Sequence, residues 1–301
     1  MTQVLLGALS LGLLWAIMTI GVYITYRILD IADLTVEGTL PLGGAIACVL
    51  ITQKVDPYLA SLIAMLGGCL AGLCTGLLHT KLKIPALLSG ILTMIALYSI
   101  NLRIMNAPNL SILRRPTVFK PLVKMGLSND FASIVIGLLF AFAVISLLYW
   151  FFGTELGSAI RATGNNQRMV RAQGVNTDTM KILGLVISNG LVALSGAFIA
   201  QSQNSADVQM GTGSIVIGLA SLIIGEVLFG GRSFYRRLVA LILGAVAYRI
   251  IIALVLEMGM NPNDLKLFTA ITVAICLWLP QGKQLIRTFV KSMKKEGEEN
   301  A

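Results

Sequence analysis

Charged side chains are scarce in this chain. Only 12% of its 301 residues are charged, 56% are hydrophobic, and the mean hydropathy is +0.84. A soluble globular domain has about 25% charged residues, so that class is excluded. The apolar residues gather in runs of about 17–25 residues, the length at which a helix crosses the hydrocarbon core of a bilayer. We therefore predict an all-α polytopic membrane protein.

The chain also lacks the residue sets of catalytic and metal sites. It has one histidine, and its four cysteines lie inside apolar runs without a metal-ligand pattern, which favours small buried hydrophobic residues. No G-x-x-x-x-G-K-[ST], H-E-x-x-H or G-x-S-x-G motif occurs. We expect no catalytic residue, no metal and no cofactor in this chain, and hence no enzyme activity.

The net charge of +9 is not read as a signal for nucleic acid, because Lys and Arg gather on the cytoplasmic loops of membrane proteins. The apolar runs predict about nine membrane passes. Their approximate ranges are 3–28, 39–51, 57–79, 84–100, 131–152, 182–200, 214–230, 238–256 and 267–279. Run 39–51 is short and contains Pro41, Gly43 and Gly44, which favours a broken or re-entrant helix and would lower the number of passes to eight.

Basic loops give the orientation. Residues 153–181 (here the basic segment), the 231–237 loop and the tail 281–301 fall on one side, which the positive-inside rule makes cytoplasmic. Loops 201–213 and 258–264 contain no Lys or Arg and lie outside, as does segment 101–130 despite its basic residues. Residues 1–280 form the predicted transmembrane domain and 281–301 a cytoplasmic tail. The N-terminus lies outside with nine passes and inside with eight.

The basic segment is predicted to hold a short helix. Asn165 or Asn166 suits its N-cap, and Gly174 suits a left-handed C-cap. It contains no nucleophile or phosphate loop, which indicates a mechanical contact. On run 57–79, the ridge Gly68-xxx-Gly72-xxx-Gly76 favours close packing inside the protein over a subunit interface.

Charges inside apolar runs are costly and are therefore candidates for function. Segments 33–40 and 207–214 resemble each other weakly, each leading into a short run, and such repeats place the substrate path between them. The candidate substrate-pathway residues are Asp33, Glu37, Pro41, Gly43, Asp207, Glu226 and Arg249. Two structural alternatives stay open: Asp30 and Asp33 pair with Arg27 at the membrane surface, and Glu226 pairs with Arg249.

Four stretches carry a resemblance to a known family. They are GSAIRATGNNQRMVRAQGVN (157–176) with Ser188-Asn-Gly and Ser195-Gly196 after it, residues 32–44, IGEVLFGGR (224–232) and NPNDLK (261–266). Together they resemble ABC importer permeases of the branched-chain amino acid/ribose class. The last two stretches are most similar to the tryptophan/tyrosine-type amino acid permeases.

The resemblance implies a bacterial plasma-membrane subunit that forms a dimer, here a homodimer, above separate ATPase subunits that hold ATP and Mg. The basic segment would dock into an ATPase groove as the coupling helix, with Met169, Val170 and Val175 filling that groove. The implied coupling residues are Arg161, Gly164, Asn165, Arg168, Met169, Arg171, Gly174 and Val175. An amphipathic helix lying on anionic lipid is the alternative.

The outer basic residues Arg114, Arg115, Lys120 and Lys124 would receive acidic residues of a solute-binding protein, or else reach lipid headgroups. The implied cargo is a small solute, with an amino acid, aromatic ones included, favoured over a nucleoside or sugar. A stand-alone secondary transporter driven by an ion gradient is the alternative from a different class, and it requires ion-binding acids at mid-membrane.

Overall fold

The computed structural model describes residues 2–230 and 233–258, and a few isolated residues between 264 and 274. Helices make up most of it. The helices are α1 (Thr2–Tyr23), the π-helical turn η1 (Ile24–Ile28), α2 (Val36–Thr52), α3 (Pro57–Thr80), α4 (Ala86–Met105), α5 (Lys120–Lys124), α6 (Asn129–Gly153), α7 (Glu155–Asn165), α8 (Gln167–Ala172), α9 (Thr177–Gln203), α10 (Ser214–Phe229) and α11 (Phe234–Glu257). Two short strands, β1 (Asn109–Ser111) and β2 (Ser205–Asp207), complete the fold.

The apolar helices match the first eight predicted runs. Six of them are long and apolar enough to span a membrane: α1 continued by η1 as one span, α3, α4, α6, α9 and α11. The apolar helices α2 and α10 are shorter. The all-α polytopic prediction is confirmed at this level. The predicted run 267–279, apart from isolated residues, and the tail 281–301 lie outside the described residues.

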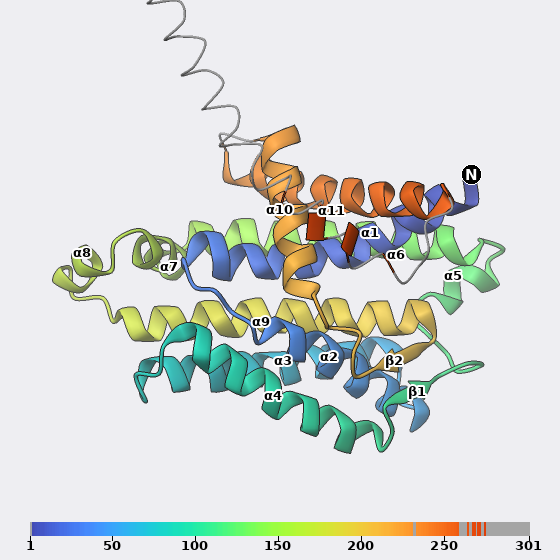
Figure 1. The fold of residues 1–301 in the computed structure, drawn as a ribbon, viewed down its shortest axis with the longest axis horizontal. Helices are drawn as coiled ribbons and strands as arrows, with labels where there is room; N and C mark the ends of the chain where they lie inside the picture. Colours follow the sequence, from blue (N-terminus) through green and yellow to red (C-terminus); the bar gives the residue numbers. More distant parts are fainter. Residues whose placement is uncertain are drawn as a thin grey trace, which may run out of the picture.

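Helix α9 is the centre of the bundle. It packs against α1, α2 and α3, and Figure 1 shows it running the length of the molecule between them. Glycine permits this close approach: a Cβ on Gly72 of α3 would collide with the Leu185 carbonyl, and one on Gly196 of α9 with the Leu40 carbonyl. The ridge Gly68-xxx-Gly72-xxx-Gly76 thus faces α9, and the prediction of internal packing is confirmed.

Helix α2 is continuous from Val36 to Thr52, so the predicted break within 39–51 is wrong. Pro41 has no N–H to donate to the Glu37 carbonyl, but it lies early in the helix, and Gly211 packs against both residues. The interruption comes earlier, in the non-helical residues 29–35 between η1 and α2. Helix α2 packs along α9, whereas α10 packs against α1, α2 and α11.

The loops are sorted to the two ends of the bundle. Strands β1 and β2 pair antiparallel, with Asn109 opposite Asp207, and so join segment 101–130 to loop 201–213 as the predicted outer side requires. This small sheet was not predicted, and α4 continues to Met105, so residues 101–105 of the predicted outer segment are helical. Helices α7 and α8 lie at the opposite end from the strands and the N-terminus (Figure 1).

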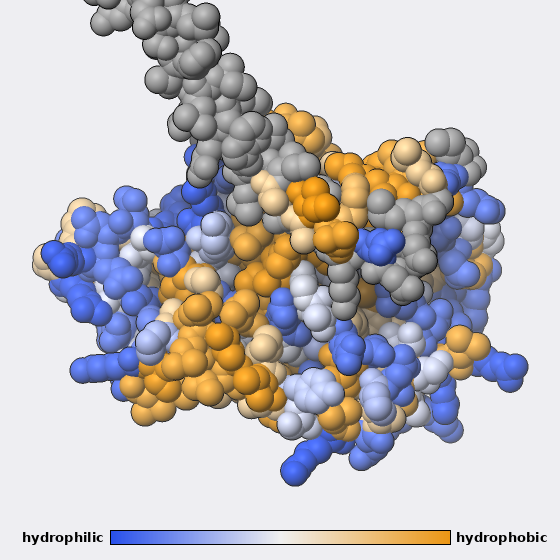
Figure 2. All heavy atoms as spheres, in the orientation of Figure 1, coloured by the Kyte–Doolittle hydropathy of each residue, from blue (hydrophilic) through white to orange (hydrophobic). Residues whose placement is uncertain are grey.

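Side-chain character follows the same division. Figure 2 shows hydrophobic residues gathered over the middle of the molecule and hydrophilic residues at both ends. Large apolar side chains exposed in this middle zone include Leu66 and Leu70 of α3, Leu92 of α4 and Leu139 of α6. An apolar band between two polar ends fits a protein embedded in a bilayer.

Candidate functional site

The basic segment forms two helices, α7 and α8, where one was predicted. They meet at Asn166, whose extended backbone interrupts the helix and whose side chain accepts from the Met169 N–H at 3.1 Å. Of the two predicted N-caps, Asn166 is therefore the one used. Gly174 has φ +83°, a left-handed conformation that glycine adopts without steric cost, and it turns the chain toward α9.

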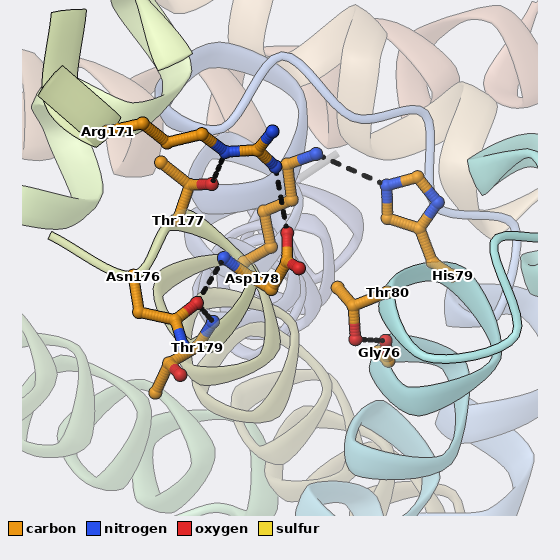
Figure 3. A network of polar contacts seen from close by, with 9 residues as sticks. Gly76, His79, Thr80, Arg171, Asn176, Thr177, Asp178 and Thr179 are labelled. Atoms are coloured by element: carbon orange, nitrogen blue, oxygen red, sulfur yellow. Dashed lines mark hydrogen bonds and ion pairs between the residues drawn. The ribbon is translucent and has the colours of Figure 1, made fainter. Parts of the chain in front are cut away.

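Hydrogen bonds attach α8 to α9, as Figure 3 shows. Arg171 donates from Nε to Thr177 Oγ1 at 2.7 Å and from Nη2 to Asp178 Oδ1 at 3.1 Å. Asn176 caps α9 by accepting from the N–H groups of Asp178 and Thr179. Lys181 Nζ then lies 3.5 Å from His79 Nε2, which links the start of α9 to the end of α3.

The surface that the basic segment offers is smaller than predicted. Arg168 and Met169 are exposed, but Val170 is buried inside the protein, so it is not free to fill a partner's groove. Val175 packs against the core. Towards the membrane helices, Arg161 lies over the Phe234 ring at 5.6 Å, and Gly164 fits against the Ile28 carbonyl, where a Cβ would collide.

A buried polar network fixes the start of α2 beside Asn189, midway along α9. The Asn189 side chain donates to Asp33 Oδ2 at 2.7 Å and accepts from Thr39 Oγ1 at 2.8 Å. Asp33 Oδ1 accepts from the Thr35 N–H at 3.0 Å. The network continues to α3 and α4 through hydroxyl bonds of Thr35 with Thr75, 2.8 Å, and of Thr75 with Thr93, 2.9 Å. Each polar group thereby gains a partner in an apolar surrounding.

Next to this network lies a cavity of about 390 Å³ between α2, α4 and the segment that leads into α10. Its lining residues are Glu37, Gly38, Pro41, Met94, Ile95, Tyr98, Asn101, Val208 and Thr212. Glu37 Oε1 accepts from the N–H of Gly213, the N-cap of α10, at 3.1 Å. The two segments with the weak internal similarity therefore meet here, and both short helices begin at the cavity.

Two of the seven predicted pathway residues, Glu37 and Pro41, line this cavity. Gly43 instead packs against the Ala193 carbonyl of α9. Asp207 lies in β2, where its carboxylate accepts from the Gln209 N–H at 2.6 Å and from Asn109 Nδ2 at 3.3 Å. Asp33 lies in the buried network behind the cavity.

The ion pairs that we considered from the sequence are wrong. Arg27 pairs with Glu226, at 3.4 Å between Nε and Oε1, instead of with Asp30 or Asp33. Arg249 does not pair with Glu226. It is partly buried, its guanidinium carbon lies 4.2 Å from the centre of the Trp15 ring, and its enclosed Nε has no partner among the described residues. The reason is that the Asp33 carboxylate accepts a hydrogen bond from Asn189, and that η1 places Arg27 beside Glu226 of α10.

The outer basic residues lie between β1 and the end of α5, at the end of the bundle away from α7 and α8 (Figure 1). Arg114 and Lys124 are exposed, and Arg115 and Lys120 are partly exposed. Within the described residues no group of His, Cys, Asp and Glu is arranged to hold a metal ion.

Sequence reasoning missed most residues of the cavity and network, among them Tyr98, Asn101 and Asn189. Asn101 is fully buried and donates from Nδ2 to the Gly38 carbonyl at 3.2 Å. For the two asparagines, the available signal was an uncharged amide in or beside an apolar run, since such groups need a partner in a membrane.

Comparison with known proteins decides the family. Residues 4–277 match the family described as "Branched-chain amino acid transport system / permease component". The chain belongs to this permease family. The permease is thus a non-enzymatic transport subunit of an ABC-type system and a multi-pass protein of the bacterial plasma membrane, and its family implies ATPase and solute-binding partners.

Its relatives differ in the solutes for which they are named. The permease is 43% identical to the "Tyrosine transport system permease protein" of Clostridioides difficile, over 89% of this chain and 88% of the relative. It is 34% identical to an uncharacterised protein of Rickettsia prowazekii, over 91% and 97%. It is 26% identical to the ribose import permease protein of Haemophilus influenzae, over 77% and 70%. No solved structure matches the chain.

Proposed function

We propose that this permease is the membrane subunit of an ATP-driven importer for an amino acid, aromatic ones included, and that α8 couples it to the ATPase. The observation that carries the coupling role is the attachment of the basic segment. Arg168 and Met169 are exposed at the end of the molecule, while Arg171 holds the same helix on α9. A force applied to α8 therefore reaches the central helix of the bundle.

The ATPase subunit supplies the ATP and Mg that this chain has no motif to bind. Its closure on ATP would push α8 and shift the packed helices as rigid bodies. A second copy of the permease completes the translocation path as a homodimer. At the outer end, Arg114, Arg115, Lys120 and Lys124 receive acidic residues of a solute-binding protein.

The support for an amino acid cargo is the 43% identity to a permease named for tyrosine. Relatives named for other solutes are more distant, the ribose permease at 26% and an autoinducer 2 permease at 30% over only 61% of this chain. The cavity beside Glu37 adds a site of suitable chemistry, with one carboxylate among apolar and aromatic side chains.

Reconstitution tests the proposal. The permease, its ATPase and the solute-binding protein are placed in proteoliposomes, and uptake of radiolabelled L-tyrosine is followed with and without ATP. We expect uptake that requires ATP and all three proteins. Uptake by the permease alone, driven by an ion gradient, would show a secondary transporter instead, and ATP-dependent uptake of ribose but no amino acid would reject the cargo.

The coupling role has its own test. Arg168→Glu should lower both ATPase co-purification and uptake, because it reverses a charge on the exposed face of α8. Glu155→Gln, a charge change at an exposed position in the first turn of α7, serves as the control. If Arg168→Glu keeps normal ATPase co-purification and uptake, α8 does not contact the ATPase.

A further inference from the structure

The cavity beside Glu37 has the chemistry to select one end of its ligand. We propose that it binds the ammonium group of a small amine with an apolar body, and that Glu37 and Asn101 accept hydrogen bonds from that group. This inference rests on the proposed function, since it assigns the solute site of the importer to this cavity.

The charge of the cavity favours a cation. Glu37 is the one charged side chain among the lining residues that the structure describes. Its Oε1 accepts from Gly213, and no described residue donates to its Oε2. Glu37 is half-buried, and a carboxylate that is partly withdrawn from water without a cation nearby attracts a positively charged ligand.

Asn101 adds an acceptor with no partner. Its side chain is fully buried, and Nδ2 donates to the Gly38 carbonyl at 3.2 Å. That bond sets the orientation of the amide, because only the NH₂ end donates to a carbonyl. Oδ1 is then left with no hydrogen-bond partner among the described residues. An unpaired buried acceptor costs free energy, and an ammonium N–H would relieve that cost.

The rest of the lining suits an apolar body. Met94 and Ile95 of α4, Pro41 of α2 and Val208 contribute hydrocarbon surface, and Tyr98 contributes an aromatic ring. The volume of about 390 Å³ lies within the range of about 300–1,000 Å³ that is usual for small-molecule sites.

A ligand carboxylate finds no cation among the described lining residues, which include no Lys or Arg. The hydroxyl groups of Tyr98 and Thr212 are neutral donors only. The N–H of Gly213, at the start of α10, which would otherwise attract an anion, already donates to Glu37. The cavity therefore pairs the amine end of an amino acid with a charge and leaves its acid end without one.

Three related probes separate these requirements: L-tyrosine, tyramine, which lacks the carboxylate, and 3-(4-hydroxyphenyl)propionate, which lacks the amine. Each is titrated into the purified full-length permease in detergent micelles by calorimetry. We expect tyramine to bind at least as tightly as L-tyrosine, and the acid about ten-fold more weakly or worse, because a hydrogen-bonded charge is lost. Equal binding of the acid and L-tyrosine would overturn the inference.

Variants place the effect at Glu37. Glu37→Gln keeps an acceptor for Gly213 but removes the charge, and it should weaken tyramine binding about ten-fold or more. Glu155→Gln should bind tyramine like the unchanged protein. Unchanged tyramine affinity in Glu37→Gln would assign the site elsewhere. The ligand series on the unchanged protein gives its answer even if a variant does not fold.

Failure of this inference is distinguishable from failure of the proposed function. A permease that shows ATP-dependent tyrosine uptake with its partners but binds neither amine leaves the importer in place and rejects the cavity as an amine site. If the assembled complex without substitutions shows no ATP-dependent uptake, the importer function itself is rejected.

Discussion

At the scale of single residues, Gly164 marks the closest contact between the basic segment and the first membrane helix. The Ile28 carbonyl lies where a side chain at position 164 would begin, so α7 rests directly on the end of η1. A methyl group added here must push the two backbones apart, and there is no flexible side chain to give way.

Gly164→Ala should therefore destabilise the permease by about 1–3 kcal/mol, the usual cost of overpacking. SDS-driven unfolding in mixed micelles, followed by circular dichroism, measures it. Gly153→Ala is the matched control, because a Cβ there meets nothing within 4 Å and Gly153 has no positive φ. Equal effects of the two substitutions would contradict the contact at Ile28.

The sequence predicts single residues well where local chemistry is sufficient. The N-cap at Asn166 and the left-handed Gly174 follow from the helix ends alone. The burial of Val170 and the pairing of Arg27 with Glu226 depend on how distant helices pack, and nothing in the neighbouring residues reveals this.

At the scale of elements, the joint between α8 and α9 consists of one arginine and two acceptors. Arg171 and Asp178 form an ion pair that is largely exposed, which by itself contributes little stability. We therefore expect the pair to matter for the position of α8 on α9 more than for stability.

Arg171→Ala and Asp178→Ala should each lower uptake in the reconstituted complex while changing unfolding by less than about 1 kcal/mol. Because both remove the same contact, the double variant should be no worse than the worse single one. Additive losses of uptake would mean that Arg171 and Asp178 act separately, for example with Arg171 in contact with the ATPase.

A second element-scale prediction concerns the network at the start of α2. Asn189→Ala removes the donor to the buried Asp33 and the acceptor of Thr39, and we expect it to cost about 3 kcal/mol in SDS-driven unfolding. Thr19→Val is the control and should change stability by less than about 1 kcal/mol, since the Thr19 hydroxyl bonds only within its own helix. Similar losses in both variants would show that the network does not hold α2.

The sequence predicted an element well where that element is a long, uninterrupted apolar run. Long apolar runs gave α1, α3, α6 and α11 nearly as observed. Pro41 and its neighbouring glycines were misleading because their packing partners, Gly211 and Ala193, come from remote segments. The strands β1 and β2 are three residues each, too short for any alternation of side chains to be visible.

At the scale of the whole molecule, the two ends must face opposite sides of the membrane. With the four cysteines replaced by alanine, Ser111→Cys at the end of β1 should react with an impermeant thiol reagent in intact cells. Ser158→Cys in α7 should react only after permeabilisation, since the positive-inside rule predicts that the basic segment is cytoplasmic. Both positions are exposed, so lack of access through burial is not a concern. The reverse pattern would invert the topology.

Helix α9 connects those two ends without a break. Its 27 residues span about 40 Å, from Thr177, which accepts from Arg171 of the basic segment, to Gln203, two residues before β2. A change in the position of such a helix at one end can affect binding at the other end, in either direction. If a protein bound at the outer sheet changes how tightly another binds at α8, then the inner partner must change the affinity of the outer one by the same factor. Under the proposed function, the solute-binding protein and the ATPase would therefore influence each other's binding through this one helix.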